Sequence, residues 1–142
     1  MIDDNNKTFC IMPWIHLHAW PNGNAFLCCV ANAGNPNSVV GDLSTHTIAE
    51  IINNDTMKEI RRKMVAGEEI SGICDNCYNA ERLRGHSWRK GFADEFKHCV
   101  EEVKNTIDYD TFDGTITPKL KYFDFRFSNL CNRECRTCGA DL

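Results

Sequence analysis

Three cysteines near the end of the sequence have the spacing that carries the most chemical information. Cys131, Cys135 and Cys138 form a CxxxCxxC pattern. Three thiolates on one short loop can bind three irons of a cubane iron-sulfur cluster, so the fourth iron keeps an open coordination position. Such an iron can bind a small molecule and reduce it. The alternative is a zinc site in which a distant His or Cys completes the tetrahedron.

The segment that precedes this pattern predicts a strand. From Leu120 to Phe127, phenylalanine stands at every second position of the later half, with charged residues between. A strand that runs directly into a CxxxCxxC loop resembles the first strand and cluster loop of the radical SAM family. The resemblance implies that Cys131, Cys135 and Cys138 bind a 4Fe-4S cluster whose unique iron is chelated by S-adenosylmethionine. Electron transfer from the cluster would cleave the sulfonium and release a 5'-deoxyadenosyl radical.

This resemblance also implies a class of reaction and a set of partners. The protein would be an oxidoreductase that begins its reaction by abstracting hydrogen from a substrate carbon. Its partners would be S-adenosylmethionine, an electron donor such as flavodoxin or ferredoxin, and a substrate. Members of the family often act on peptides or proteins, and some act on small molecules.

A second set of cysteines strengthens the resemblance. Cys10 is followed by Gly23, then by Cys28 after four intervening residues, and later by the CxxC pair Cys74 and Cys77. This order is similar to the twitch domain, the shorter relative of the SPASM domain that accompanies many radical SAM enzymes. The resemblance implies that Cys10, Cys28, Cys74 and Cys77 bind an auxiliary 4Fe-4S cluster, which relays electrons or supports the fold.

A metal site in this region also makes physical sense. A unit of about 80 residues has a small core and often needs a metal to stabilise it. A zinc ribbon with the same four ligands satisfies that argument equally well. Cys29 points away from Cys28 in a regular strand, so we expect only one of them to bind metal, and the Gly23 spacing favours Cys28. Cys99 is expected to be a buried, inert thiol, and we assign no metal to the histidines.

The composition fits a protein that works in a reducing compartment. The chain has 142 residues, of which 42% are hydrophobic and 25% charged, and a net charge of -4. It lacks the clustered basic residues that bind nucleic acid and the long apolar run that spans a membrane. Nine cysteines, an odd number, come without a secretory signal. Metal binding in the cytoplasm therefore explains them better than disulfide bonds.

The elements that must position the first cysteines begin with a predicted hairpin between residues 9 and 30. The apolar residues expected in its first extended run are Trp14, Ile15, Leu17 and Trp20. A three-residue loop, with Pro21 first and Gly23 last, places Cys28 opposite His16. A two-residue turn would shift the pairing by one residue and move Cys28 beside Leu17. Because Pro fits the first central position of a type I turn, we favour the three-residue loop.

Helices are predicted between the hairpin and the CxxC pair. Thr47 to Glu50 reads as a capping box that opens a helix. The apolar stripe expected along it consists of Ile48, Ile51, Ile52, Ile60 and Met64. The triplet from Asn53 to Asp55 is expected to break or kink this helix, because short polar side chains compete for backbone hydrogen bonds. Gly67 is expected to end it.

The rest of the chain predicts a turn, two helical stretches and a connection. Cys74 to Cys77 should lie on a short turn, followed by a helical stretch through residues 80–84. Phe92 to Ile107 carries apolar residues at helical spacing and predicts one further helix. A turn-rich segment from Asp108 to Pro118 then leads to the strand before the CxxxCxxC loop.

These predictions combine into an α+β fold class with three parts. Residues 1–90 would form a small twitch or SPASM-like domain, made of a β-hairpin and helices. Residues 91–118 would be a helix and linker. Residues 119–142 would be the first strand and cluster loop of a truncated radical SAM (β/α) partial barrel. A single strand makes no barrel, so we expect an N-terminal fragment of a longer enzyme, inactive by itself.

Two functions remain open at this point. The first is a part of a radical SAM enzyme with a reducing cluster and an auxiliary cluster. The second is a non-catalytic zinc- or iron-sulfur-binding module that organises a structural or interaction domain.

Overall fold

The protein is a mixed α+β domain with one four-stranded sheet. The computed structural model describes residues 2, 3 and 5–128. The predicted cluster loop with Cys131, Cys135 and Cys138 lies outside these described residues. The elements, in chain order, are α1 (Met12–Ile15), β1 (His16–Ala19), β2 (Asn24–Phe26), η1 (Pro36–Ser38), β3 (Val39–Asp42), α2 (Ile48–Ile52), α3 (Asp55–Ala66), α4 (Asp75–Arg84), α5 (Trp88–Glu95), α6 (Lys97–Thr106) and β4 (Tyr122–Phe125).

The predicted hairpin exists, and its turn is the three-residue loop. β1 and β2 are antiparallel, with His18 opposite Phe26 and Ala19 opposite Ala25. The Gly23 amide donates to the Trp20 carbonyl at 3.0 Å, and Gly23 has a φ of 88°. This is the left-handed conformation that glycine tolerates best, so it closes the turn without strain. Regular pairing stops at Phe26, before Cys28.

The first extended run is shorter than predicted. Trp14 and Ile15 belong to the one-turn helix α1 and not to a strand. Pro13 stands in the first turn of α1, where its fixed φ suits a helix and its missing N–H costs no hydrogen bond. Every residue of α1 is buried. A short apolar run does not by itself distinguish a buried turn of helix from a strand, which explains the error.

The predicted helix break and both helix ends are confirmed. Thr47 and Glu50 form a capping box at the start of α2. The helix is then interrupted after Ile52, and the Asn54 side chain caps α3 by accepting a hydrogen bond from the Met57 amide at 2.9 Å. Gly67 ends α3 with a φ of 84°. Local side-chain chemistry therefore determines where these two helices begin and end.

The helices that follow differ from the prediction in two ways. α4 begins at Asp75, so Cys77 lies in its first turn rather than on a separate turn before it. The single helix predicted from Phe92 to Ile107 is two helices, α5 and α6, separated at Phe96. The apolar spacing continues through that break, so periodicity alone could not reveal it.

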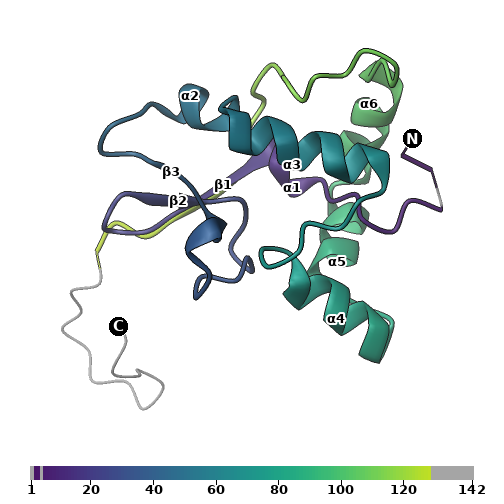
Figure 1. Cartoon of the computed structure of the whole chain (residues 1–142), viewed down its shortest axis with the longest axis horizontal. Coiled ribbons are helices and arrows are strands. Elements are labelled where there is room, and N and C mark those ends of the chain that lie inside the picture. The colour runs from purple at the N-terminus through teal and green to yellow at the C-terminus, as the bar shows by residue number, and fades with distance from the viewer. Residues whose placement is uncertain (1, 4, 129–142) are drawn as a thin grey trace.

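β4 lies in the predicted terminal strand and joins the hairpin in one sheet. The strand order is β3-β2-β1-β4, and β4 runs parallel to β1 (Figure 1). Two buried histidines reinforce this pairing. His16 Nδ1 donates to the Tyr122 carbonyl at 2.9 Å, and His18 Nδ1 lies 3.0 Å from the Asp124 carbonyl oxygen. The described residues contain no further strand beside β4, and the radical SAM partial barrel stays a prediction.

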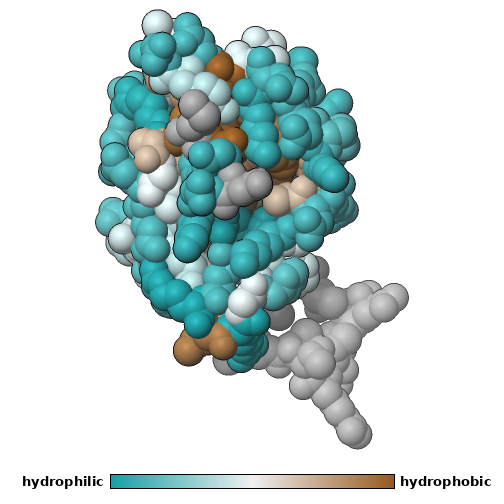
Figure 2. All heavy atoms as spheres, turned by 90° about the vertical axis from the view of Figure 1, so that its right-hand side faces the viewer, coloured by the Kyte–Doolittle hydropathy of each residue, from teal (hydrophilic) through white to brown (hydrophobic). Residues whose placement is uncertain are grey.

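The helices pack on the sheet around one core. α2 approaches β3 so closely that a Cβ on Gly41 would meet Ile51 at 2.7 Å. On the face that carries His16, the Tyr122 ring lies 6.0 Å from Phe92 and 6.2 Å from Phe96. The side of the molecule seen in Figure 2 is mainly hydrophilic, with hydrophobic residues visible in recesses. Within the described residues, no helix has the length and apolar character needed to cross a bilayer.

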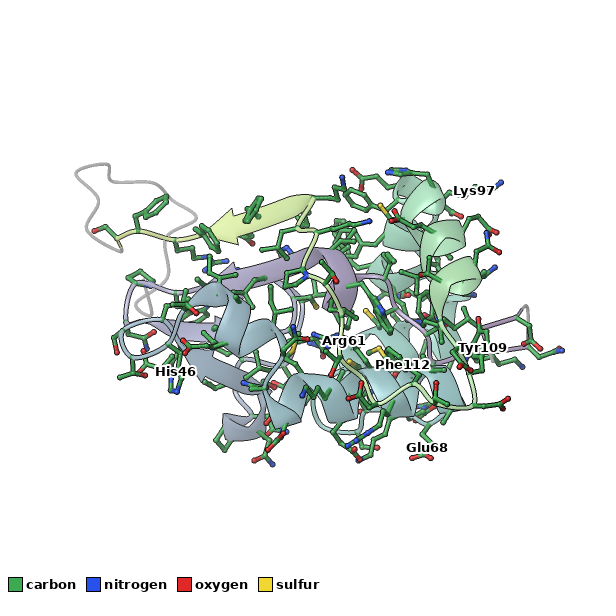
Figure 3. All side chains as sticks on the ribbon, turned by 90° about the horizontal axis from the view of Figure 1, so that it is seen from above. His46, Arg61, Glu68, Lys97, Tyr109 and Phe112 are labelled. Atoms are coloured by element: carbon green, nitrogen blue, oxygen red, sulfur yellow. The ribbon has the colours of Figure 1, made fainter. Side chains whose placement is uncertain are left out.

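The segment of residues 108–118, which we call the arch, returns from α6 to the sheet without regular structure. The arch crosses α3. Figure 3 shows Arg61 in the interior of the molecule and Phe112, a residue of the arch. The fully buried Arg61 donates Nε to the Pro13 carbonyl at 3.0 Å and its two Nη groups to the carbonyls of Ile52 and Gly114. One guanidinium therefore joins α1, α2 and the arch.

Candidate metal centre

Four of the cysteines singled out in the sequence line one cavity. Cys10 lies two residues before α1, Cys28 follows β2, Cys74 occupies the N-cap position of α4 and Cys77 lies in the first turn of α4. All four line a cavity of about 20 Å³ in the core. Segments that are 64 residues apart in sequence, from Cys10 to Cys74, thus meet at a single place.

Backbone contacts hold the Cys28 segment against the CxxC turn. The Asn32 amide donates to the Ile73 carbonyl at 3.1 Å. In the opposite direction, Asn76 Nδ2 donates to the Val30 carbonyl at 3.1 Å. These two hydrogen bonds fix the loop that follows Cys28 to the residues on either side of Cys74. Contacts other than those of the thiols therefore contribute to the relative position of the two segments.

A second pair of contacts holds the Cys10 segment against α4 and α5. Arg89 Nη1 donates to the Phe9 carbonyl at 2.7 Å, directly before Cys10. Tyr78, on α4, donates its hydroxyl to the Thr8 carbonyl at 3.4 Å. Tyr78 and Arg89 also line the cavity. The same two side chains therefore orient the Cys10 segment and form part of the wall.

The four sulfurs are thiols rather than disulfides, and burial favours the protonated form of Cys10, Cys28 and Cys74. Cys10, Cys28, Cys74 and Cys77 are all free cysteines. Burial raises the pKa of Cys10 to about 12, and a negative charge on Cys77 would raise it further. Burial also raises the pKa values of Cys28 and Cys74 well above the ordinary value, and each thiolate would repel the others. A bound metal reverses this balance, because a coordinating thiol gives up its proton.

Positive charge near the thiols comes from one ion pair. Arg89 donates Nε to Glu81 Oε1 at 2.8 Å and Nη2 to Glu81 Oε2. Ser87 donates its hydroxyl to the same Oε1 at 2.5 Å. Burial alone would raise the pKa of Glu81, but the hydrogen bonds from Arg89 and Ser87 outweigh it, so this pKa is lowered. The carboxylate stays ionised and holds the guanidinium beside the cavity.

The donor set fits an iron-sulfur cluster in its chemistry, and the cavity has part of the space that a cluster needs. Four thiols that converge from different segments are the usual ligand set of such clusters. A cavity of about 20 Å³ has room for about one water molecule. Cluster binding therefore requires the thiols and the loop at Val30 and Ala31 to move outward. Among the described residues, no group of three or more His, Cys, Asp or Glu side chains is arranged to bind one metal ion.

The remaining described cysteines lie outside the cavity. Cys29 is half-buried and faces Tyr122, and burial raises its pKa. The strand ends at Phe26 and Cys29 begins a turn, so the strand alternation that the sequence suggested does not apply to this pair. Cys99 is buried in α6, where its sulfur lies 3.2 Å from His98 Nε2. Tyr78 and Arg89 give no signal in the sequence, because they have no distinctive spacing relative to the cysteines.

Comparison with known families identifies the same region. Residues 10–78 match the family model of SPASM, an iron-sulfur cluster-binding domain. The matched range begins at Cys10 and ends one residue beyond Cys77. The match supports iron-sulfur cluster binding by this part of the chain, a property typical of domains found in radical SAM enzymes. No curated protein and no solved structure matches the chain.

Proposed function

We propose that Cys10, Cys28, Cys74 and Cys77 bind an auxiliary 4Fe-4S cluster. The observation that carries this proposal is the shared cavity, where four free thiols from three separate segments face one another. The SPASM match over residues 10–78 supports the same chemistry. Hydrogen bonds from Arg89, Tyr78 and Asn76 hold the three segments beside one another, so cluster binding would require the thiols to move but not the segments to assemble.

The wider proposal is that the chain is part of a radical SAM enzyme. In this enzyme Cys131, Cys135 and Cys138 would bind a second 4Fe-4S cluster together with S-adenosylmethionine. That cluster would supply the electron for reductive cleavage of the sulfonium. The strand β4 supports the proposal, since it lies where the sequence predicted the strand that leads into the CxxxCxxC loop. The protein's own contribution would be to hold the two sets of thiols, and a peptide or protein is the substrate class we favour.

The test is the metal content of the full 142-residue chain, purified and reconstituted without oxygen. Two clusters correspond to about eight irons and eight sulfides per chain. Replacing Cys131, Cys135 and Cys138 with Ala together should leave about four irons at the proposed auxiliary site. An electron paramagnetic signal that changes on adding S-adenosylmethionine, and is lost in that triple variant, would support the second site.

Matched cysteine variants test the assignment of ligands. Cys28→Ala should lose the auxiliary cluster, whereas Cys29→Ala, its direct neighbour, should retain it. Cys99→Ala provides a second control, because this thiol is buried elsewhere in the core. Stoichiometric zinc in place of iron would reject the proposal in favour of a structural zinc module, and equal iron loss in Cys28→Ala and Cys29→Ala would reject the ligand set.

A further inference from the structure

Among the described residues that line the cysteine cavity, Arg89 is the one with a charged side chain. The others are cysteines, methionines, aliphatic residues and Tyr78. Arg89 is 9% exposed, so water screens its charge poorly. A fixed cation in such a place affects the energy of any negative charge that the cavity holds.

Three contacts fix the guanidinium of Arg89 on the rim of the cavity. Nη1 donates to the Phe9 carbonyl at 2.7 Å, beside Cys10. Nε and Nη2 both donate to Glu81, with Nε 2.8 Å from Oε1. This two-point contact with a carboxylate gives the guanidinium one orientation. Rotation of Arg89 away from the cavity would break all three contacts.

Glu81 lies further from the cavity than Arg89 does. It occupies α4 four residues after Cys77, but it does not line the cavity. Its side chain is 14% exposed, compared with 10% for that of Arg89. The ion pair is therefore oriented, with its positive end toward the thiols and its negative end away from them.

We infer that the Arg89–Glu81 pair sets the reduction potential of the cluster that Cys10, Cys28, Cys74 and Cys77 would bind. This inference rests on the proposed function. Four thiolates give the site negative charge, and reduction adds one more electron to it. A nearby fixed cation stabilises the reduced form and raises the potential, whereas a more distant carboxylate opposes the cation. Arg89 and Glu81 are positioning residues in this scheme, since neither binds iron.

The inference predicts shifts of opposite sign for two variants of one ion pair. Arg89→Met removes the near positive charge and should shift the midpoint potential to a more negative value. Glu81→Gln leaves Arg89 charged but without its counter-charge and should shift the potential to a more positive value. Arg89→Lys keeps a cation and should stay closer to the unmodified protein than Arg89→Met. A purely structural role predicts no such order, because all three variants would weaken the same contact.

The experiment is an anaerobic redox titration followed by electron paramagnetic resonance. It uses the full chain in which Cys131, Cys135 and Cys138 are Ala, so that signals come from the proposed auxiliary site alone. Arg82→Met is the matched control, because Arg82 lies on α4 and pairs with Glu69 on the exposed surface. We expect this control to leave the potential unchanged.

The outcomes separate this inference from the proposed function. If the chain binds no iron at the four cysteines, the proposed function fails and this inference fails with it. If iron binds but Arg89→Met and Glu81→Gln shift the potential in the same direction, or not at all, only the inference is overturned. Should Arg89→Met fail to hold the cluster, Glu81→Gln still decides, since a positive shift supports the inference and no shift rejects it.

Discussion

The cysteine cavity and the arch both bring together segments that are far apart in sequence, but their polar groups are satisfied in different ways. In the arch, the Gly114 carbonyl accepts from Arg61, and both backbone groups of Ile116 bond to the Asn53 side chain at 2.8 and 3.1 Å. In the cavity, four thiols line one space, three of them buried and that of Cys74 half-buried. These backbone groups of the arch are thus satisfied by protein side chains, whereas the cavity concentrates thiols that we propose to be metal ligands.

This contrast predicts where the molecule depends on a cofactor. Metal binding adds its free energy to folding when the site is assembled from separate segments. The segments around the cavity fit that description, and the arch does not. Variants and conditions that affect one region should therefore leave the other largely unchanged.

Removal of iron is the perturbation with the largest expected effect. Apoprotein should lose amide-exchange protection in α4 and in the loop after β2, by several kcal/mol in opening free energy. Amides of α3, beneath the arch, should change far less. Hydrogen exchange followed by mass spectrometry, on iron-loaded and iron-free protein, measures both regions together. Equal loss of protection in the two regions would remove the distinction between them.

Arg61→Met should produce the largest effect within the arch region. It leaves the buried carbonyls of Pro13, Ile52 and Gly114 without their donor, at a cost of about 3 to 5 kcal/mol in unfolding free energy. Arg62→Met is the matched control. Its side chain is exposed and pairs with Glu59, so we expect a loss below about 1 kcal/mol. Urea unfolding of both variants checks this, and similar losses would show that Arg61 does not join the elements.

Gly114→Ala should follow with a somewhat smaller loss. Gly114 has a φ of 90°, and a Cβ there would lie 2.3 Å from the Lys58 carbonyl oxygen on α3. We expect a loss of about 2 to 3 kcal/mol, because the arch must move away from the helix. Gly85→Ala, with a φ of 71° but nothing within 4 Å, isolates the conformational part and should cost about 1 kcal/mol. Thermal denaturation of both variants measures the two losses. Equal losses would contradict the close approach of Gly114 to α3.

The smallest expected effect is a pH dependence of the unfolding free energy. It comes from His16, at the pairing of β1 with β4. Burial lowers the pKa of His16, so the unfolded chain takes up a proton more readily than the folded one. The stabilisation is present above the ordinary histidine pKa and is lost as pH falls toward the lowered value. His16→Gln should flatten the decline in stability from pH 7 to pH 5. His46→Gln, at an exposed position, should not, and urea midpoints across this range test both variants.

The parts of the fold that were predictable depend on neighbouring residues. Thr47, Asn54 and Gly67 mark helix ends through their own side chains and conformations, and Pro21 with Gly23 specifies the turn. The resemblance to the twitch domain, which the spacing of the cysteines carries, named the four cysteines that line the cavity; their role as ligands stays a prediction. Helix caps and turns depend on residues that are close together in the sequence, so they can be predicted from it.

The parts that were not predictable depend on distant residues. The pairing of β4 with β1 joins His16 to Tyr122, 106 residues away. Arg89 acquires its place beside the cavity from contacts with Phe9 and Glu81, and its own type and spacing signal nothing. Such contacts arise only when the chain has folded, so they give no local pattern.

The parallel alignment of β1 and β4 has a consequence for distance. Cys10 and Cys28 flank the end of the sheet where β1 begins and β2 finishes, whereas the chain leaves β4 at the opposite end, where the Arg126 amide donates to Ala19. Four residues of strand span about 13 Å. The parallel pairing thus leads the chain away from the cysteine cavity, over the whole length of β1, before it leaves the sheet.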